Sequence, residues 1–555
     1  MLRRRALSAV VTFALCASSL APALAKDPAP PAPYPAAPPQ LVVAISIDQF
    51  SADLFAQYRA RFSGGLARLQ QGGVFPSAYQ GHAATETCPG HSTILTGTRP
   101  ARNGIIANNW IDLASTRPDK RVYCAEDVSD PASTTKDPVV SAAFLKVPTL
   151  GEYMKAQWPG ARNVAVSAKD RAVVMMGGHK IDEGYWYKAG QFVTFKGISP
   201  SAAAVAENAA LALALAKGAK PYTPPAWCAA RSGVLTVGKA GELGNGRFAL
   251  APKDADGFRI SPRMDAATLD LALNLVGQLK LGKGTAPDLL SVSLSATDYI
   301  GHAVGTEGME MCIQMAELDK ALGAFFAKLD KTGIDYAVVL TADHGGLDLP
   351  ERLDAQALPR AVRSDPALGV KALGAEIKAK LGFDPGEPLL FGDGPFGDYY
   401  VSRKLTAEQR GKVIDALIAK LRANPQVAAA FGAGELAATP VPSGSPQDWT
   451  LRERARASFD PARSGDVVML LDRAVVPIPE ANKGYTATHG SAWDYDRRVP
   501  LLFWRKGMAG FEQPAPVETV DIAPTLAAIL GLKVPEGSFD GRCLDLDAGA
   551  GNTCR

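Results

Sequence analysis

The sequence predicts an α/β fold, a three-layer sandwich with a largely parallel central sheet, because short apolar runs alternate with amphipathic stretches. The apolar runs carry no charge, as is typical of strands buried on both faces, and lie at residues 41–47, 164–166, 289–294, 336–340 and 501–504. Helical patterns lie at residues 201–217, 265–281, 311–330 and 407–423. The third of these leads through Thr332-Gly333 into the next strand, which is the order expected in a parallel sheet.

The first 40 residues predict export rather than folded structure. Residues 1–25 begin with Met-Leu-Arg-Arg-Arg, continue through an apolar run and end in Ala-Leu-Ala, which is typical of a secretory signal peptide cleaved near Ala25. Leu15 precedes Cys16 where a lipid anchor would need a small residue. Residues 26–40 are so rich in proline that we expect an extended linker. The mature protein is expected to be periplasmic or secreted, with no stable membrane anchor.

Charge and length restrict the class of protein. Removing residues 1–25 removes three arginines and no acidic residue, so the formal net charge falls from +3 to 0. This balance does not suggest nucleic acid as a specific partner. Residues 41–555 are expected to form one large domain, with insertions at about 180–260 and 351–485 that cap or frame a site. A separate small domain is the alternative for the second insertion, and the oligomeric state stays open.

The cysteines predict disulfides. Six of the seven cysteines follow the signal peptide, an even number in a compartment that permits disulfide formation: Cys88, Cys124, Cys228, Cys312, Cys543 and Cys554. Cys543 and Cys554 are close enough to close a small C-terminal loop, and a Cys124–Cys228 pair is a looser hypothesis. Buried free thiols are the alternative, and we expect Cys88 to serve in packing.

Polar side chains follow four of the predicted strands. Asp48 ends the first strand, and the others follow theirs: Lys169 and Arg171, Asp298, and Asp343 with His344. In open parallel sheets, functional groups gather in the loops at the carboxyl ends of the strands. We therefore expect these charged groups to meet at one edge of the sheet.

Two short motifs favour a metal centre. Asp298 and His302 are four residues apart after a strand, so a helical turn would place both on one side. Asp343-His344 is followed by two glycines that let the backbone turn tightly. With Asp48 and His489 these residues make three aspartates and three histidines, half of the six histidines in the chain. Such ligands suit zinc, and two ions about 4 Å apart could clamp the attacking and leaving oxygens of a phosphoryl displacement.

Residues 85–97, Thr-Glu-Thr-Cys-Pro-Gly-His-Ser-Thr-Ile-Leu-Thr-Gly, add a nucleophile motif to the ligand set. Residues 102–105 and Asn108 follow it. With the six ligand residues, these segments resemble the alkaline phosphatase superfamily, which includes nucleotide pyrophosphatases/phosphodiesterases and threonine-nucleophile alkaline phosphatases of the PafA type. The resemblance runs from about residue 41 to residue 546. Residues 520–531 and Asp540-Gly541 resemble its C-terminal part, with a structural role.

The resemblance implies the roles of the site residues. One zinc would be held by Asp298, His302 and His489, and the other by Asp48, Asp343 and His344 with Thr87 beside it. Thr87 would be the nucleophile that becomes phosphorylated, and metal coordination is one of the few ways to activate a threonine hydroxyl. The other zinc would stabilise the leaving alkoxide and then generate hydroxide. Ligand type alone leaves manganese or cobalt open.

Three further residues indicate the substrate. Asn108 would donate to a phosphoryl oxygen, and Lys169 with Arg171 would meet the remaining charge of a dianion. Family phosphodiesterases usually lack such cations, so the resemblance implies an exported alkaline phosphatase of broad specificity, acting on small phosphate monoesters through a phosphothreonine at a two-zinc site.

Several alternatives remain. The first is a phosphodiesterase or nucleotide pyrophosphatase in which Lys169 and Arg171 face elsewhere. The second is a non-catalytic, zinc-dependent binding protein. A sulfatase-like enzyme is disfavoured, because Cys88-Pro89 has the wrong spacing for its motif. We expect His91 to be a hydrogen-bonded structural residue, or else to support the nucleophile loop, and we expect His82 and His179 to lie in loops.

Overall fold

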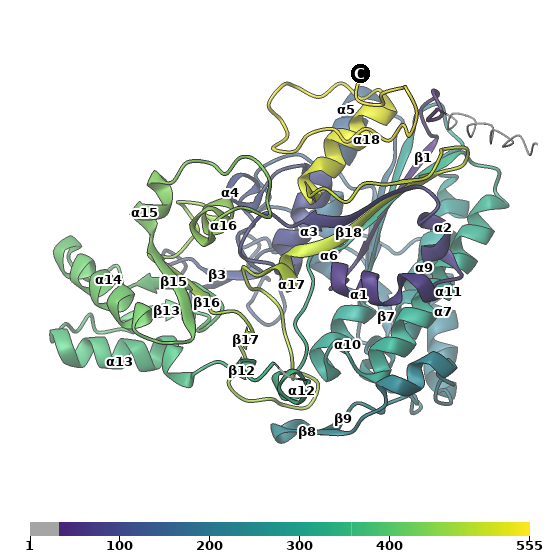
Figure 1. Cartoon of the computed structure of the whole chain (residues 1–555). Coiled ribbons are helices and arrows are strands. Elements are labelled where there is room, and N and C mark those ends of the chain that lie inside the picture. The colour runs from purple at the N-terminus through teal and green to yellow at the C-terminus, as the bar shows by residue number, and fades with distance from the viewer. Residues whose placement is uncertain (1–32, 357) are drawn as a thin grey trace, which may run out of the picture. The chain divides into compact units, whose positions relative to one another are not determined.

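The computed structural model describes residues 33–356 and 358–555, and its centre is one large sheet (Figure 1). The predicted signal peptide and the first part of the predicted linker lie outside the described residues. The strands follow the order β19-β2-β18-β11-β1-β10-β5-β6-β7, with β20 paired to β2. At one end of this order lie β19 (Phe511–Glu512), β2 (Gly73–Tyr79) and β20 (Val517–Glu518). Strands β1 (Leu41–Ile47), β10 (Asp288–Leu294), β11 (Tyr336–Thr341) and β5 (Asn163–Ser167) occupy the middle.

The middle of the sheet is parallel and fully buried. β1 pairs in parallel with both β10 and β11, and β10 pairs in parallel with β5. Every residue of these four strands is buried, which is why their sequences are continuous apolar runs. The predicted strand at residues 501–504 is part of β18 (Arg498–Arg505), which runs antiparallel to β11. The prediction of a largely parallel sheet is confirmed.

Helices cover both faces of the sheet (Figure 1). One layer contains α7 (Ala202–Lys217), α9 (Pro262–Leu279) and α11 (Met309–Asp330), which pack on one another. The other contains α3 (Thr87–Thr96), α6 (Asp170–Gly177) and α18 (Ile522–Leu530), with α3 in contact with both of the others. The three-layer α/β prediction is confirmed. Within the described residues no helix is long and apolar enough to cross a membrane.

A second, smaller sheet is formed by part of residues 351–485, where we expect an insertion. Its order is β13-β14-β16-β15, built from β13 (Leu390–Gly392), β14 (Asp398–Val401), β16 (Val467–Leu471) and β15 (Val427–Gly432). Helices α13 (Val370–Leu381) and α14 (Ala407–Arg422) pack against it around a hydrophobic core of their own. Residues 180–260 contribute β6 (Glu183–Lys188) and β7 (Gln191–Val193) to the edge of the large sheet, then α7.

The structure contains three disulfides: Cys88–Cys124, Cys228–Cys312 and Cys543–Cys554. The predicted C-terminal pair is confirmed. The Cys124–Cys228 hypothesis is wrong, because the segment after hairpin β3–β4 (Asn109–Ile111, Arg121–Tyr123) returns to the first turn of α3, where Cys124 pairs with Cys88. Cys88 is buried in a hydrophobic cluster, as its expected packing role requires, but it is not a free thiol. Sequence spacing does not reveal that two distant segments meet in this way. The C-terminal pair can be predicted from spacing because its two cysteines are already close in the sequence.

We expect the Cys228–Cys312 bridge to stabilise the fold by lowering the conformational entropy of the unfolded chain. It closes a loop across a sequence separation of 84 residues, so replacing both cysteines with serine is expected to lower the free energy of unfolding by about 4 kcal/mol. Guanidinium denaturation of the oxidised protein measures this. The Cys543–Cys554 pair, with a separation of 11, is the matched control and should cost less. An equal loss from both double variants would contradict the argument.

Candidate metal centre and nucleophile

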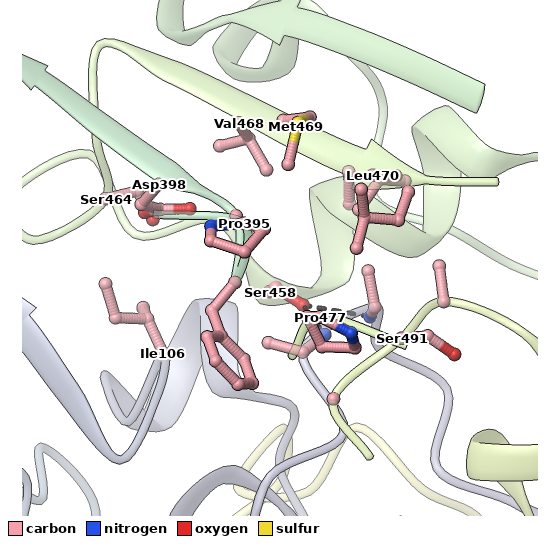
Figure 2. A pocket seen from close by; sticks show the side chains of 18 of the residues that line it. Ile106, Pro395, Asp398, Ser458, Ser464, Val468, Met469, Leu470, Pro477 and Ser491 are labelled. Atoms are coloured by element: carbon pink, nitrogen blue, oxygen red, sulfur yellow. Dashed lines mark hydrogen bonds between the residues drawn. The ribbon is translucent and has the colours of Figure 1, made fainter. Parts of the chain in front are cut away.

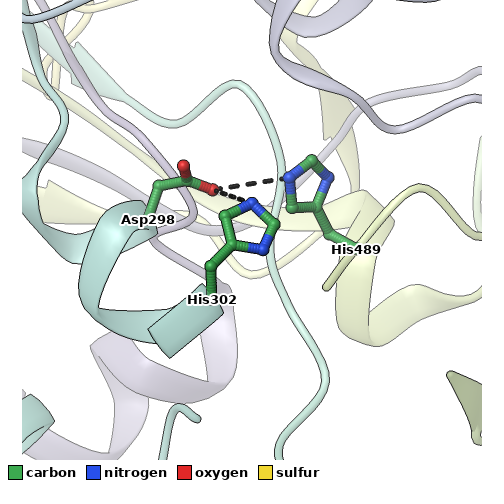
Figure 3. Close-up of side chains that lie close together, drawn as sticks. All are labelled: Asp298, His302 and His489. Carbon is green, nitrogen blue, oxygen red and sulfur yellow. Dashed lines mark ion pairs between the residues drawn. The ribbon is translucent and has the colours of Figure 1, made fainter. Parts of the chain in front are cut away.

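Asp298, His302 and His489 form a compact group of possible metal ligands (Figure 3). Asp298 and His302 lie one turn apart on α10 (Ala296–Val304), as predicted. Asp298 Oδ1 is 3.2 Å from His302 Nε2 and 3.4 Å from His489 Nε2. Ligand atoms about 2.0–2.1 Å from a tetrahedral ion lie about 3.3–3.4 Å apart, so this spacing fits a zinc ion. We refer to these three residues as group A.

Asp48, Asp343 and His344 form a second compact group, called group B here. His344 Nε2 lies 3.3 Å from Asp343 Oδ2 and 3.4 Å from Asp48 Oδ1. Asp48 directly follows β1 and Asp343 follows β11, which is the neighbouring strand, so sheet pairing brings the two carboxylates together. All three residues are buried. Their spacing fits a second ion in the same way.

The three histidines of groups A and B share one hydrogen-bond pattern. Nδ1 of His302 lies 2.8 Å from the Ala487 carbonyl oxygen, and Nδ1 of His344 and His489 lies 2.8 Å from the carbonyl oxygens of Gly345 and Thr85. A carbonyl can only accept, so each Nδ1 carries the proton and each Nε2 presents a lone pair to its group. Burial lowers the pKa of His344 to about 3 and also lowers the pKa of His489, which keeps both rings neutral.

Several atoms of the two groups lack hydrogen bonds although they are buried. Asp48 Oδ1, Asp298 Oδ1 and His344 Nε2 have no hydrogen-bond partner among the described residues. Leaving buried polar atoms unpaired is costly, and a bound cation would satisfy all three. The donors are carboxylate oxygens and imidazole nitrogens, which suit zinc. The residues present therefore fit two such ions.

The charge of the site also favours bound cations. Burial, together with the carboxylates of Asp298 and Asp343, raises the pKa of Asp48 well above its ordinary value. Lys169 Nζ lies 2.7 Å from Asp48 Oδ2 and also contacts Asp298 Oδ2. Burial alone would lower the pKa of the Lys169 ammonium, but these carboxylates outweigh burial and raise it, so the side chain is a cation. One ammonium among three buried carboxylates leaves negative charge that divalent cations would neutralise.

Thr87 begins α3 and lies where two cationic side chains meet. Its Oγ1 is 3.4 Å from Lys169 Nζ and 3.3 Å from Arg171 Nη2. Gly90, one turn further on, is packed so closely that a Cβ atom there would lie 2.0 Å from the Asp343 carbonyl oxygen. This close approach holds the first turn of α3 against group B. The N-terminus of α3 also favours an anion beside Thr87.

His91 lies beneath the nucleophile and is fully buried. Its Nδ1 is 2.9 Å from the Thr87 carbonyl oxygen and 3.0 Å from Asp343 Oδ2, and its Nε2 is 2.9 Å from Ser293 Oγ. The expected hydrogen-bonded structural role is therefore confirmed, and the same contacts support the nucleophile turn. His82 and His179 lie in loops, as expected.

Asn108 makes three hydrogen bonds close to Thr87, two of them with the residues on either side of it. Its Oδ1 accepts from the Cys88 backbone N–H at 2.8 Å, and its own N–H donates to a Glu86 carboxylate oxygen at 2.9 Å. The Cys124 N–H donates to its carbonyl oxygen, next to the Cys88–Cys124 bridge. Because Oδ1 is occupied, the amide Nδ2 is the group left to donate to a substrate oxygen.

Sequence reasoning missed two supporting carboxylates. Glu86 is adjacent to Thr87 in the sequence, but its contact with Asn108 is visible only in the fold. Asp265 accepts from the Ala296 N–H at 2.9 Å and from Gln314 Nε2 at 2.7 Å, and so it fixes the start of α10, the helix of Asp298 and His302. The signal for Asp265 was present, since it occupies a fully buried position of amphipathic helix α9.

The close packing of Gly90 gives a test of how α3 is held. Alanine normally favours a helix interior over glycine by about 1 kcal/mol. Because its Cβ would clash with the Asp343 backbone, Gly90→Ala is instead expected to lower the free energy of unfolding by about 1–3 kcal/mol. Gly411→Ala on α14, where a Cβ meets nothing within 4 Å, is the matched control and should raise it. Urea denaturation of both variants decides this, and stabilisation by both would refute the packing argument.

Comparisons with known proteins agree with this geometry. A profile of the family described as type I phosphodiesterase / nucleotide pyrophosphatase matches residues 42–492. Alkaline phosphatase PhoK from Sphingomonas sp is 54% identical, over 94% of this chain and 93% of that protein. Alkaline phosphatase PhoD from Zymomonas mobilis is 48% identical, over 93% of this chain and 89% of that protein.

The crystal structure of wild-type alkaline phosphatase PafA matches this fold with a TM-score of 0.80 at 26% identity, over 93% of this chain and 100% of that one. A second PafA structure carries substitutions at a threonine, an asparagine, a lysine and an arginine. The first two of those positions are 21 apart and the last two are 2 apart, as are Thr87 and Asn108, and Lys169 and Arg171, here. The chain thus belongs to the type I phosphodiesterase / nucleotide pyrophosphatase family and is a PafA-like member of the alkaline phosphatase superfamily.

Proposed function

We propose that this protein is an exported alkaline phosphatase that hydrolyses small phosphate monoesters through a phosphothreonine at Thr87, with two zinc ions as cofactors. The observation that carries the proposal is the approach of both Lys169 and Arg171 to the Thr87 hydroxyl. Two cations beside the nucleophile match the two negative charges of a phosphate monoester. The relatives named alkaline phosphatase support the same activity.

The reaction has two steps at the carboxyl edge of the central strands. Thr87 Oγ1 loses its proton and attacks phosphorus, the bond from phosphorus to the alcohol oxygen breaks, and the alcohol leaves with a proton from solvent. Water then attacks phosphorus, the bond to Thr87 breaks, and inorganic phosphate is released with the hydroxyl restored. Zinc ions in groups A and B would lower the pKa of the Thr87 hydroxyl and of the attacking water, and would provide a counter-charge to the oxygens.

The side chains of this chain orient the phosphoryl group. Arg171 Nε is buried and has no hydrogen-bond partner among the described residues, so a phosphate oxygen would satisfy it. Asn108 Nδ2 is free to donate to another oxygen, because Oδ1 already accepts from Cys88. Asp170 Oδ1 accepts from the Arg171 N–H and from the Tyr123 hydroxyl, which fixes the turn that carries Arg171. Charge that develops on the phosphoryl oxygens would meet donors already in place.

We expect the purified mature protein to hydrolyse p-nitrophenyl phosphate faster than bis-p-nitrophenyl phosphate at alkaline pH. Chelation should abolish the activity and zinc should restore it. Thr87→Ala should lose at least about 10³-fold in kcat while keeping its zinc, because groups A and B remain complete without Thr87. Metal analysis beside the kinetics separates loss of the nucleophile from loss of the ions. Faster diester cleavage would make the protein a phosphodiesterase, and no cleavage of either ester would favour a binding protein.

The two cations give a sharper test of substrate class. Lys169→Ala and Arg171→Ala should each lower kcat/KM for the monoester by about 10²-fold, and for the diester by less, because a dianion loses more stabilisation than a monoanion. The exposed Lys180→Ala is the matched control and should change neither rate. Zinc content must be measured for Lys169→Ala, since Lys169 also contacts Asp48 and Asp298. Equal losses on both esters would count against the monoesterase assignment.

A further inference from the structure

A cleft of about 240 Å³ opens beside the histidines of group A. His302 and His489 line it, and four aromatic residues form much of the remaining wall: Trp110, Phe396, Tyr400 and Tyr485. Tyr485 is 40% exposed, although it is aromatic, and its ring centroid is 5.2 Å from that of His302. An exposed aromatic ring beside candidate metal ligands offers a surface for a planar or apolar group.

The position of the cleft assigns it to the organic part of a substrate. Under the proposed function, Thr87 attacks from beside group B, where Gly90 packs on Asp343. The alcohol must leave on the opposite side of phosphorus, which is the side of group A. His302 and His489 line the cleft, whereas Asp48, Asp343 and His344 do not. The organic group of a bound monoester therefore lies in this cleft, a conclusion that rests on the proposed function.

The charges in the cleft restrict that group. Three carboxylates line it, from Glu86, Asp393 and Asp398, against one guanidinium, from Arg171. Arg121 forms an ion pair with Asp393. An organic group that carried a second phosphate or carboxylate would meet an excess of like charge, whereas a neutral group would not.

An apolar cavity adjoins the cleft (Figure 2). The two share Ala84, Ile106, Phe396 and Asp398 as lining residues. The rest of the cavity wall comes largely from β16 and from two loops, with Val468, Met469, Leu470 and Pro477 among its members. Phe396 therefore lies at the boundary between the aromatic cleft and the apolar cavity.

The cavity is small, with a volume of about 50 Å³. A dry cavity of about 150 Å³ is known to hold a benzene ring. The smaller cavity here can therefore admit an aromatic ring or an alkyl chain only if part of its wall moves. Phe396 lies in the connection between β13 and β14, where Gly394 and Gly397 have φ angles of 75° and 128°. Two glycines in backbone conformations that other residues rarely adopt allow this connection to rearrange around Phe396.

We propose that the cleft and the cavity form one subsite for a neutral aromatic or alkyl group of the monoester, with Phe396 as the movable wall between them. The favoured substrates are then monophosphates of uncharged hydrophobic alcohols, and a longer alkyl chain reaches past Phe396 among the residues of β16. Burial of each further methylene would strengthen binding in the transition state as well as in the ground state.

The test is kcat/KM for ethyl, butyl, hexyl and octyl phosphate, four primary alcohols with similar leaving-group chemistry. We expect at least a tenfold rise from ethyl to hexyl phosphate. The monophosphate of 6-hydroxyhexanoate, which is anionic at its far end, should be cleaved less efficiently than hexyl phosphate.

Val468→Phe, which fills the cavity from β16, should reduce the hexyl-to-ethyl ratio at least threefold, and Phe396→Ala should shift the steepest rise to longer chains.

Val441→Phe is the matched control, because Val441 is 66% exposed and lines neither the cleft nor the cavity. It should leave the ratio unchanged. Active protein with a flat chain-length series, or an unchanged ratio in Val468→Phe, would overturn the subsite and leave the phosphatase assignment intact. Failure of the wild type to cleave p-nitrophenyl phosphate as well as the four esters after zinc is restored would overturn the phosphatase assignment itself.

Discussion

The arrangement of this molecule depends on concentrated negative charge at one edge of the sheet. In the order β11-β1-β10-β5, the residues that follow the strands are Asp343, Asp48, Asp298 and Lys169. Neighbouring strands lie about 4.8 Å apart. Pairing of β1 with β11 therefore brings Asp48 and Asp343 together, and the segments that follow β10 and β5 add the Asp298 carboxylate and the Lys169 ammonium to this row. Their side chains are buried, and without counter-charge this row would oppose folding. A pair of divalent cations held by groups A and B would resolve the conflict.

The rest of the site is organised around that row. The histidines reach it from helix α10 and from two loops and are oriented by backbone carbonyls, so their tautomers are fixed before an ion binds. Asp265 fixes the start of α10 from within α9, and Gly90 fixes the start of α3 against Asp343. These contacts are buried and local, which gives the rigidity that a centre built for charge stabilisation needs.

Much of this could be predicted from the sequence because the chemistry directly follows buried strands. Asp48 and Asp343 are each found by locating the end of an apolar run, and Asp298 with His302 by helical spacing. The Cys88–Cys124 pair and the contact of Glu86 with Asn108 could not be found in this way, since both depend on how loops return in space. The cleft escaped prediction for the same reason. Phe396 and Tyr485 lie in irregular connections, and only the fold brings them beside His302.

The residues proposed for the reaction and those proposed for substrate selectivity come from different parts of the fold. In the proposed reaction, the phosphoryl group contacts residues that the central sheet and its adjoining turns position, such as Thr87, Lys169 and Arg171. In the proposed subsite, the organic group contacts residues of the second sheet and its connections, and some of these, such as Val468 and Leu470, belong to a hydrophobic cluster separate from the main core. A change in the β13–β14 connection can therefore alter which alcohols fit without moving a metal ligand. Gly397 follows Phe396, and Gly394 lies two positions before it with Pro395 between; this connection lies outside the central sheet, so the sheet does not fix the shape of that wall.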